Sequence, residues 1–168
     1  MPELPAQAGG LQAKILTISD GVAAGTREDR SGRALADRLQ AGGYIVVEQL
    51  VCADGVDAVS DALRAMSAGF SGLVVTTGGT GFGPRDYTPE GTRAVIEREA
   101  PGLAEAMRRA SDADGRGFGM LSRGVCGTVD AVLVCNLPGS SSGAVECLEA
   151  ILAVVPHALD LLGGGRPH

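Results

Sequence analysis

The residues best suited to chemistry lie between Thr76 and Glu90, where the sequence reads TTGGTGFGPRDYTPE. An apolar run at 73–75 leads directly into this glycine-rich stretch. Glycine adopts left-handed backbone cheaply and lets a ligand approach closely, and exposed backbone N–H groups in such a loop attract phosphate. Arg85 adds a planar cationic fork for phosphate or carboxylate, and Asp86 adds a carboxylate suited to Mg²⁺. The stretch therefore predicts a phosphate site with an adjacent metal ligand.

Three other polar segments follow apolar runs in the same way. Ser19-Asp20-Gly21 follows the run at 14–18, Asp54 comes shortly after the run at 44–51, and 136–143 follows the run at 131–135. In an open α/β sheet, ligands bind outside the carboxyl ends of the strands. If these strands are parallel, the four loops open on one edge and line one site.

Each of these features also has a simpler interpretation. Residues 78–81 are compatible with a tight turn without a ligand, and 136–139 with a plain strand-to-helix connection capped by serine. Asp54 is compatible with a helix cap, Asp20 with a turn closed through its own backbone, and Arg123 with a solvated surface charge. Their joint occurrence favours a shared site over five separate structural roles.

The elements that must position these loops alternate along the chain. Strands are expected at 14–18, 44–51, 72–76 and 131–135, and helices at 30–41, around 59–66, at 89–99 and at 101–110. The segment 111–119 is expected to be a loop, 120–129 to form short strands or a small hairpin, and a last long helix to carry Val145, Leu148, Leu152 and Val155. This alternation predicts an α/β fold with a mainly parallel sheet covered on both faces.

Composition excludes several classes of function. The chain of 168 residues is expected to form one domain with flexible tails at 1–12 and 164–168. A net charge of −6 and 3% aromatic residues argue against nucleic-acid binding. No apolar run approaches the ~20 residues of a membrane span and no signal peptide is recognisable, so a cytoplasmic protein is expected. Lys14 is the sole lysine and no Gly-Lys-Ser/Thr triplet occurs, which excludes a P-loop.

The motifs, taken together, resemble the signature of the molybdopterin-binding MoaB/Mog family. The resemblance covers about residues 13–163 and includes, in the same order, Ser19-Asp20, the block 76–90, Leu121-Ser122-Arg123 and Asn136-Leu137-Pro138-Gly139. It implies a three-layer α/β/α molybdopterin-binding domain. It also implies a Mg²⁺-dependent adenylyltransferase that uses ATP and molybdopterin, assembles as a homotrimer or hexamer, and contacts a molybdenum-insertion protein.

The resemblance assigns roles residue by residue. Asp86 matches the family's essential aspartate, and Asp54 matches a second acidic position that usually follows proline but here follows Ala53. Both are expected to be catalytic and to hold Mg²⁺, with Asp20 as a further candidate ligand. Two departures concern Gly21, where many members have a larger polar or basic residue, and Ser140, which replaces the usual residue. The expected substrate-binding residues are Ser19, Asp20, Gly78, Gly79, Thr80, Gly81, Arg85, Ser122, Arg123, Asn136, Pro138, Gly139 and Ser140.

Four alternatives remain open beside the adenylyltransferase. The nearest is a MoaB-type paralogue that binds molybdopterin without catalysis, as a carrier or assembly protein. The related domains of molybdenum-insertion proteins and of competence-damage proteins normally accompany further domains. A purely structural role leaves the acidic, glycine-rich loops unexplained.

Overall fold

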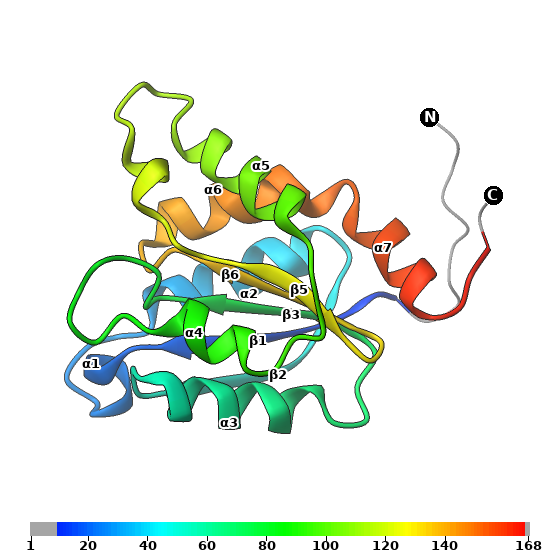
Figure 1. The fold of residues 1–168 in the computed structure, drawn as a ribbon, viewed down its shortest axis with the longest axis horizontal. Helices are drawn as coiled ribbons and strands as arrows, with labels where there is room; N and C mark the ends of the chain where they lie inside the picture. Colours follow the sequence, from blue (N-terminus) through cyan, green and yellow to red (C-terminus); the bar gives the residue numbers. More distant parts are fainter. Residues whose placement is uncertain (1–9, 167–168) are drawn as a thin grey trace.

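The computed structural model describes residues 10–166, which are built around a six-stranded sheet of order β2-β1-β3-β6-β5-β4 (Figure 1). The parallel strands are β2 (Ile45–Cys52), β1 (Gln12–Ile18), β3 (Gly72–Thr77) and β6 (Val132–Leu137). Two short strands, β5 (Cys126–Val129) and β4 (Arg98–Glu99), extend the sheet in antiparallel fashion. The expected mostly parallel α/β sheet is confirmed.

Helices cover both faces of the sheet (Figure 1). One face carries α2 (Arg30–Ala41), α5 (Pro101–Ser111), α6 (Ser141–Leu152) and α7 (Val155–Leu162). The opposite face carries α3 (Val56–Ser67) and α4 (Thr88–Arg93). Two short elements, α1 (Asp20–Ala23) and the 3₁₀ helix η1 (Phe118–Leu121), lie in the loops beyond the sheet. The result is the three-layer arrangement that the resemblance implied.

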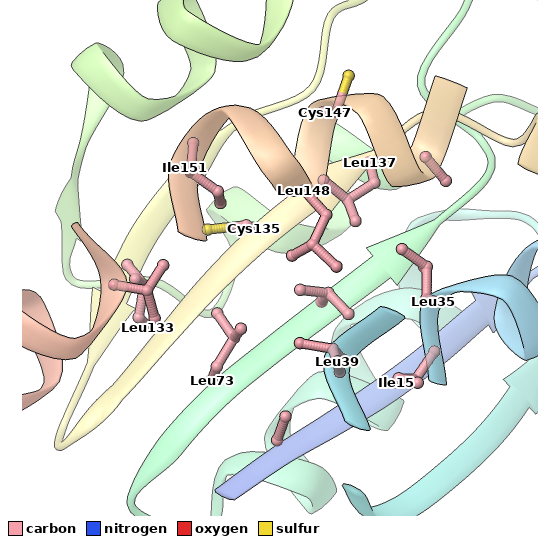
Figure 2. Packing of buried hydrophobic residues seen from close by; sticks show 14 of the residues in the cluster. Ile15, Leu35, Leu39, Leu73, Leu133, Cys135, Leu137, Cys147, Leu148 and Ile151 are labelled. Carbon is pink, nitrogen blue, oxygen red and sulfur yellow. The ribbon is translucent and has the colours of Figure 1, made fainter. Parts of the chain in front are cut away.

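Two apolar clusters fix the helices to the sheet. Along β1, Ile15 points toward the α2 and α6 side and Leu16 toward α3, as the two-residue period of a strand requires. Leu148 and Ile151 of α6 pack into the first cluster (Figure 2). Every residue of β3 and β6 is buried, which explains the uninterrupted apolar stretches at 73–75 and 132–135.

The helix expected at 89–99 is shorter than the sequence suggested. α4 ends at Arg93, and residues 98–99 form β4 instead. The N–H of Glu97 donates to the Thr128 carbonyl over 2.8 Å and that of Ala100 to Cys126 over 2.8 Å. Pairing with β5 therefore replaces the helical bonds, and Pro101 disfavours helical backbone at Ala100.

The strands or hairpin expected at 120–129 are only partly present. Residues 118–121 form η1, and β5 makes its hairpin with β6. Gly119 explains the tight turn, because a Cβ there would lie 2.3 Å from the Arg108 carbonyl and its N–H donates to Asp112 over 2.7 Å. The chain thus turns back against the end of α5 before β5 begins.

The single last helix is also a wrong expectation, because α6 ends at Leu152 and α7 begins at Val155. Pro156 explains the break: it has no N–H to donate to the turn before it, so it is tolerated only in the first turn of a new helix.

The expected tails lie partly outside the described residues, which exclude 1–9 and 167–168. β1 already includes Gln12 from the segment assigned to the first tail. Between residues 10 and 166, none of the helices has the length and apolar character needed to cross a membrane.

Candidate functional site

The loops at the carboxyl ends of β1, β2, β3 and β6 meet around a cleft of about 850 Å³. The contacts between neighbouring strand ends are direct. Thr77 donates through its hydroxyl to the Pro138 carbonyl over 2.8 Å, and Ser19 N–H donates to the Cys52 carbonyl over 3.0 Å. Of the expected site residues, the cleft is lined by Ser19, Asp54, Gly78, Gly79, Asp86, Gly139 and Ser140.

Two glycines of the 78–81 loop are required by their surroundings. Gly78 has a φ of +101° and Gly79 a φ of +68°. A Cβ on Gly78 would lie 2.2 Å from the Ile18 carbonyl oxygen, and one on Gly79 would lie 2.2 Å from the Thr88 hydroxyl. Thr88 at the start of α4 donates to the carbonyls of both glycines, at 2.8 Å and 3.0 Å. The loop is therefore tied to α4 and leaves its backbone close to the cleft.

Asp20, Asp54 and Arg85 form a closed set of contacts at one side of this cleft. Asp20 N–H donates to Asp54 over 2.9 Å, and Asp54 N–H donates to Asp20 over 3.1 Å. Arg85 donates to the Asp20 carboxylate over 3.0 Å and to the Asp54 carbonyl over 2.9 Å. The hydrogen bond from Arg85 holds the pKa of Asp20 below its ordinary value.

These contacts decide whether Asp20 and Asp54 only cap local backbone or take part in a shared site. The N-cap of α3 is Gly55, so Asp54 is not a helix cap, and Asp20 bonds across to another loop instead of closing its own turn. Arg85 is not a free fork for a substrate anion, because its guanidinium is engaged by Asp20 and Asp54. It connects the glycine-rich loop to the other two loops.

Asp54 and Asp86 are the carboxylates at the strand ends of the cleft wall that keep an oxygen available, and Glu28 adds a third carboxylate from the 26–31 wall. Asp86 accepts the N–H of Gly83 over 2.9 Å through one oxygen, and Asp54 accepts the N–H of Asp20 through one oxygen. The second oxygen of each of these two aspartates accepts no hydrogen bond within residues 10–166. In that range there is also no group of three or more acidic, histidine or cysteine side chains placed to hold a metal ion.

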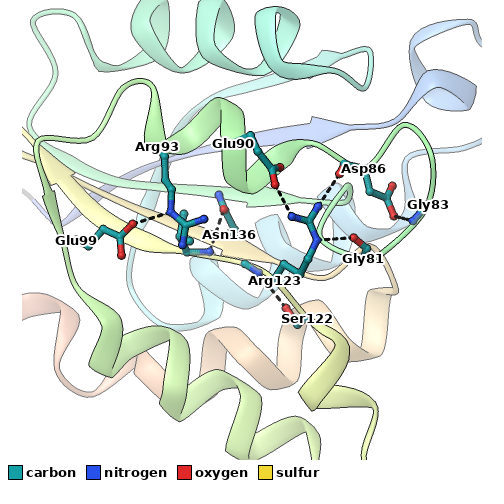
Figure 3. A network of polar contacts seen from close by, with 11 residues as sticks. Gly81, Gly83, Asp86, Glu90, Arg93, Glu99, Ser122, Arg123 and Asn136 are labelled. Atoms are coloured by element: carbon teal, nitrogen blue, oxygen red, sulfur yellow. Dashed lines mark hydrogen bonds and ion pairs between the residues drawn. The ribbon is translucent and has the colours of Figure 1, made fainter.

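Arg123 is not a solvated surface charge, because its side chain holds the glycine-rich loop (Figure 3). Its guanidinium donates to the carbonyls of Gly81 over 2.9 Å and Asp86 over 2.7 Å, and it pairs with Glu90 of α4. Its own N–H donates to the Thr80 carbonyl over 2.8 Å. Because all these contacts are within the protein, Arg123 positions Asp86 and does not reach into the larger cleft.

The Glu90–Arg123 pair gives a pH-dependent prediction. Burial by itself raises the pKa of Glu90, but the hydrogen bond and charge of Arg123 outweigh it, so the pKa lies below its ordinary value. A lowered pKa contributes stability that is fully present above the unfolded-state value of about 4.3 and is lost as the pH falls through the folded-state value. We therefore expect Glu90→Gln to lower the urea midpoint at neutral pH and to have little effect in strong acid.

The measurement is a series of urea denaturation curves from about pH 7 to about pH 3, with Glu105→Gln as the control on the exposed side of α5. A Glu90→Gln difference that stays constant across the series would contradict the prediction.

A second cleft of about 320 Å³ opens between α5, η1 and α6. Of the expected residues, it is lined by Ser122, Asn136, Pro138 and Ser140, together with Arg108 and Phe118. Ser140 also lines the larger cleft, where its hydroxyl caps α6 by accepting the N–H of Gly143 over 3.2 Å. The two clefts therefore meet at the start of α6.

Asn136 borders the second cleft, but its side chain is used entirely inside the fold (Figure 3). It is 2% exposed, accepts the N–H of Val125 over 3.1 Å, and donates to the hydroxyls of Thr76 and Thr92 over 3.0 Å and 2.9 Å. In this structure the Asn136 side chain holds β6, β3, α4 and the start of β5 together, and its assignment as a substrate-binding residue stays a prediction.

Sequence reasoning missed one wall of the larger cleft, formed by residues 26–31. Asp29 caps α2 by accepting the N–H of Gly32 over 2.9 Å and accepts the Thr17 hydroxyl over 2.8 Å. The available signal was the position of Asp29 directly before the expected helix at 30–41. A cap there brings the preceding residues back over the end of β1.

Comparison with known proteins places this geometry in a family. A family model described as a probable molybdopterin binding domain matches residues 14–157. The molybdopterin adenylyltransferase of Helicobacter pylori J99 is 36% identical over 155 residues, which cover 89% of this chain and 86% of that protein. The chain spans only 25% of the Drosophila melanogaster molybdenum cofactor synthesis protein cinnamon, to which it is 37% identical, and 48% of a Synechococcus elongatus bifunctional molybdenum cofactor biosynthesis protein.

Solved structures agree with the sequence relatives. The molybdopterin biosynthesis enzyme MoaB of Thermus thermophilus superposes with a TM-score of 0.84 at 42% identity, covering 92% of this chain and 97% of that one. The Mog protein of Mycobacterium ulcerans gives a TM-score of 0.82 at 41% identity, covering 90% and 99%. With the glycine-rich loop, the strand-end cleft and the matched model all in agreement, the chain belongs to the molybdopterin-binding domain family of MoaB and Mog proteins.

Proposed function

We propose that the protein is a molybdopterin adenylyltransferase of molybdenum cofactor biosynthesis. In this reaction the terminal phosphate oxygen of molybdopterin attacks the α-phosphorus of ATP. The bond from that phosphorus to the oxygen bridging to the β-phosphate breaks, and adenylyl-molybdopterin and pyrophosphate are released. The observation that carries the proposal is the meeting of two clefts at Ser140, one of which has two available carboxylates beside glycine backbone.

The two clefts suggest where each substrate binds. The larger has the glycine-rich loop and the N-terminus of α6, whose backbone N–H groups favour phosphate. The smaller has Met107 and Phe118 among its lining, which suits the flat pterin ring. With ATP in the larger cleft and the pterin in the smaller, the reacting phosphates meet near Ser140.

The residues present suit a reaction that needs no side-chain base. The attacking phosphate is already an anion at neutral pH, and neither cleft is lined by histidine or lysine among the residues described. What the protein must supply is positioning and compensation of negative charge, the usual requirements of phosphoryl transfer.

Asp54 and Asp86 fit the binding of Mg²⁺. Mg²⁺ is commonly held by one or two carboxylates together with substrate phosphates, and each aspartate keeps one oxygen without a hydrogen-bond partner. A Cβ on Gly79 would lie 3.2 Å from that oxygen of Asp54, so glycine keeps the space beside it open. When bound, the ion would neutralise charge on the polyphosphate.

Replacing Asp54 by alanine is expected to lower turnover by about tenfold to a hundredfold, or about 1.4–2.7 kcal/mol. The change removes one metal ligand and also the acceptor of the Asp20 N–H. The measurement is steady-state turnover across a Mg²⁺ titration, with Asp57→Ala on the exposed first turn of α3 as the control. A parental rate for Asp54→Ala at saturating Mg²⁺ would exclude the metal role.

The direct test of the function is incubation with molybdopterin, ATP and Mg²⁺, followed by detection of adenylyl-molybdopterin and pyrophosphate. Molybdopterin binding without either product would select the MoaB-type binding protein. Asp54 and Asp86 on the cleft wall favour the enzyme, since binding alone does not require them.

Three further properties stay predictions from the family resemblance: a homotrimer or hexamer, a contact with a molybdenum-insertion protein, and a cytoplasmic location. Sedimentation equilibrium of the purified protein tests the first of them, and a monomer across the micromolar range would contradict it.

A further inference from the structure

Arg27 lies on the wall of the larger cleft that sequence reasoning missed, and its backbone is held in place there. The chain between α1 and α2 turns back onto one acceptor, the Gly21 carbonyl. That carbonyl accepts the N–H of Thr26 over 2.9 Å, the Thr26 hydroxyl over 3.1 Å and the N–H of Arg27 over 3.2 Å. The position of Arg27 on the rim is therefore fixed by three hydrogen bonds.

The side chain of Arg27 lies across Gly21. A Cβ at position 21 would come within 2.7 Å of Arg27 Cδ and 3.0 Å of its Cγ, closer than side chains pack. Gly21 has ordinary helical backbone, so its φ does not require glycine. The absence of a side chain at this position is instead what lets the Arg27 stem occupy the space.

The guanidinium of Arg27 has no internal partner. Two arginines line the larger cleft, and Arg30 has a carboxylate within 3.6 Å, that of Glu28. The guanidinium of Arg27 makes no hydrogen bond or ion pair with any residue in the described range 10–166. The guanidinium groups of Arg123 and Arg85, by contrast, donate hydrogen bonds to the loops of the site. The Arg30 side chain is 80% exposed and its contact with Glu28 is too long for a hydrogen bond, so Arg27 differs from it in having no carboxylate partner and in lying over Gly21.

We propose that Arg27, lying over Gly21, binds the polyphosphate of the nucleotide substrate. A guanidinium donates two parallel hydrogen bonds to phosphate oxygens. We assign Arg27 to the nucleotide and not to molybdopterin because residues 26–31 line the larger cleft and none of them lines the smaller one. The proposal rests on the proposed function.

The test is calorimetric binding of pyrophosphate and of ATP to the full chain and to Arg27→Gln. We expect binding of both to weaken by about tenfold, the size of one lost charge-assisted contact. Arg33→Gln is the matched control, since Arg33 is an exposed arginine of α2 outside the larger cleft. In turnover assays the KM for ATP should rise in Arg27→Gln while the KM for molybdopterin stays unchanged.

A second variant tests the geometry. Gly21→Ala displaces the Arg27 stem and should weaken pyrophosphate binding in the parent, but should have no further effect when combined with Arg27→Gln. Parental pyrophosphate binding by Arg27→Gln overturns this inference and leaves the proposed function standing. A full chain that binds neither ATP nor pyrophosphate overturns both.

Discussion

Replacing Asp86 by asparagine is expected to leave a folded protein that binds molybdopterin but adenylylates it at least a hundredfold more slowly, about 2.7 kcal/mol in barrier height. The amide has the shape of the carboxylate and can still accept the N–H of Gly83 through its oxygen. The backbone contacts of residue 86, including the bond from Arg123 to its carbonyl, do not depend on the side chain. What is lost is the negative charge that faces the cleft.

The measurement combines turnover with two controls. Molybdopterin binding and the urea midpoint should match the parent, which separates loss of chemistry from loss of structure. Asp61→Asn, an exposed aspartate of α3 paired with Arg64, should turn over normally. Near-parental turnover by Asp86→Asn would remove Asp86 from the metal role and move the case toward the binding-only paralogue.

The backbone of the site was predictable from the sequence because its signals are local. Glycine at 78 and 79 follows from steric limits at a strand end, and the buried runs of β3 and β6 identify central strands. Parallel pairing then brings the loops together at one edge. The expectation that the loops at 19–21, 54, 78–86 and 136–143 open on one edge depends on these local rules alone. From these loops, one cleft is lined by Ser19, Asp54, Thr77, Gly78, Gly79, Asp86, Gly139, Ser140 and Ser141.

The partners of the polar side chains were not predictable in the same way. Arg85, Arg123 and Asn136 have chemistry that suits a ligand as well as it suits an internal contact. Whether such a side chain contacts a ligand or the protein depends on partners far away in the sequence. These partners are 31 to 65 positions from Arg85, 33 to 42 from Arg123 and 11 to 60 from Asn136. The prediction of a helix through residues 98–99 was wrong for a related reason, since these residues form a strand only by pairing with β5.

These internal contacts separate residues that hold the site from residues that face it. Arg123 fixes the carbonyls of Gly81 and Asp86, and Arg85 joins the loops of Asp20 and Asp54. The groups left to face a substrate include backbone N–H groups, the free oxygens of Asp54 and Asp86, and the guanidinium of Arg27. The Arg85–Asp20 and Arg123–Glu90 ion pairs hold the loops that carry Asp54 and Asp86, and so place these two carboxylates on the cleft wall.

Replacing Asn136 by leucine is expected to destabilise the fold by about 2–4 kcal/mol. The buried amide makes one bond to the N–H of Val125 and two to the hydroxyls of Thr76 and Thr92. The leucine side chain is of similar size, so the cost is that of three buried polar groups left without partners. The backbone N–H is the most costly of these, since the hydroxyls can turn toward other acceptors.

Urea denaturation of Asn136→Leu measures the loss, and Thr92→Val serves as the graded control because it removes one of the three bonds, at about 1 kcal/mol. If Asn136 instead acted mainly on substrate, the leucine variant would unfold at the parental urea concentration and fail only in molybdopterin binding. A loss of stability with binding retained at low urea would establish that this asparagine belongs to the frame, and that the smaller cleft recognises its ligand through other residues, Ser122 and Ser140 among them.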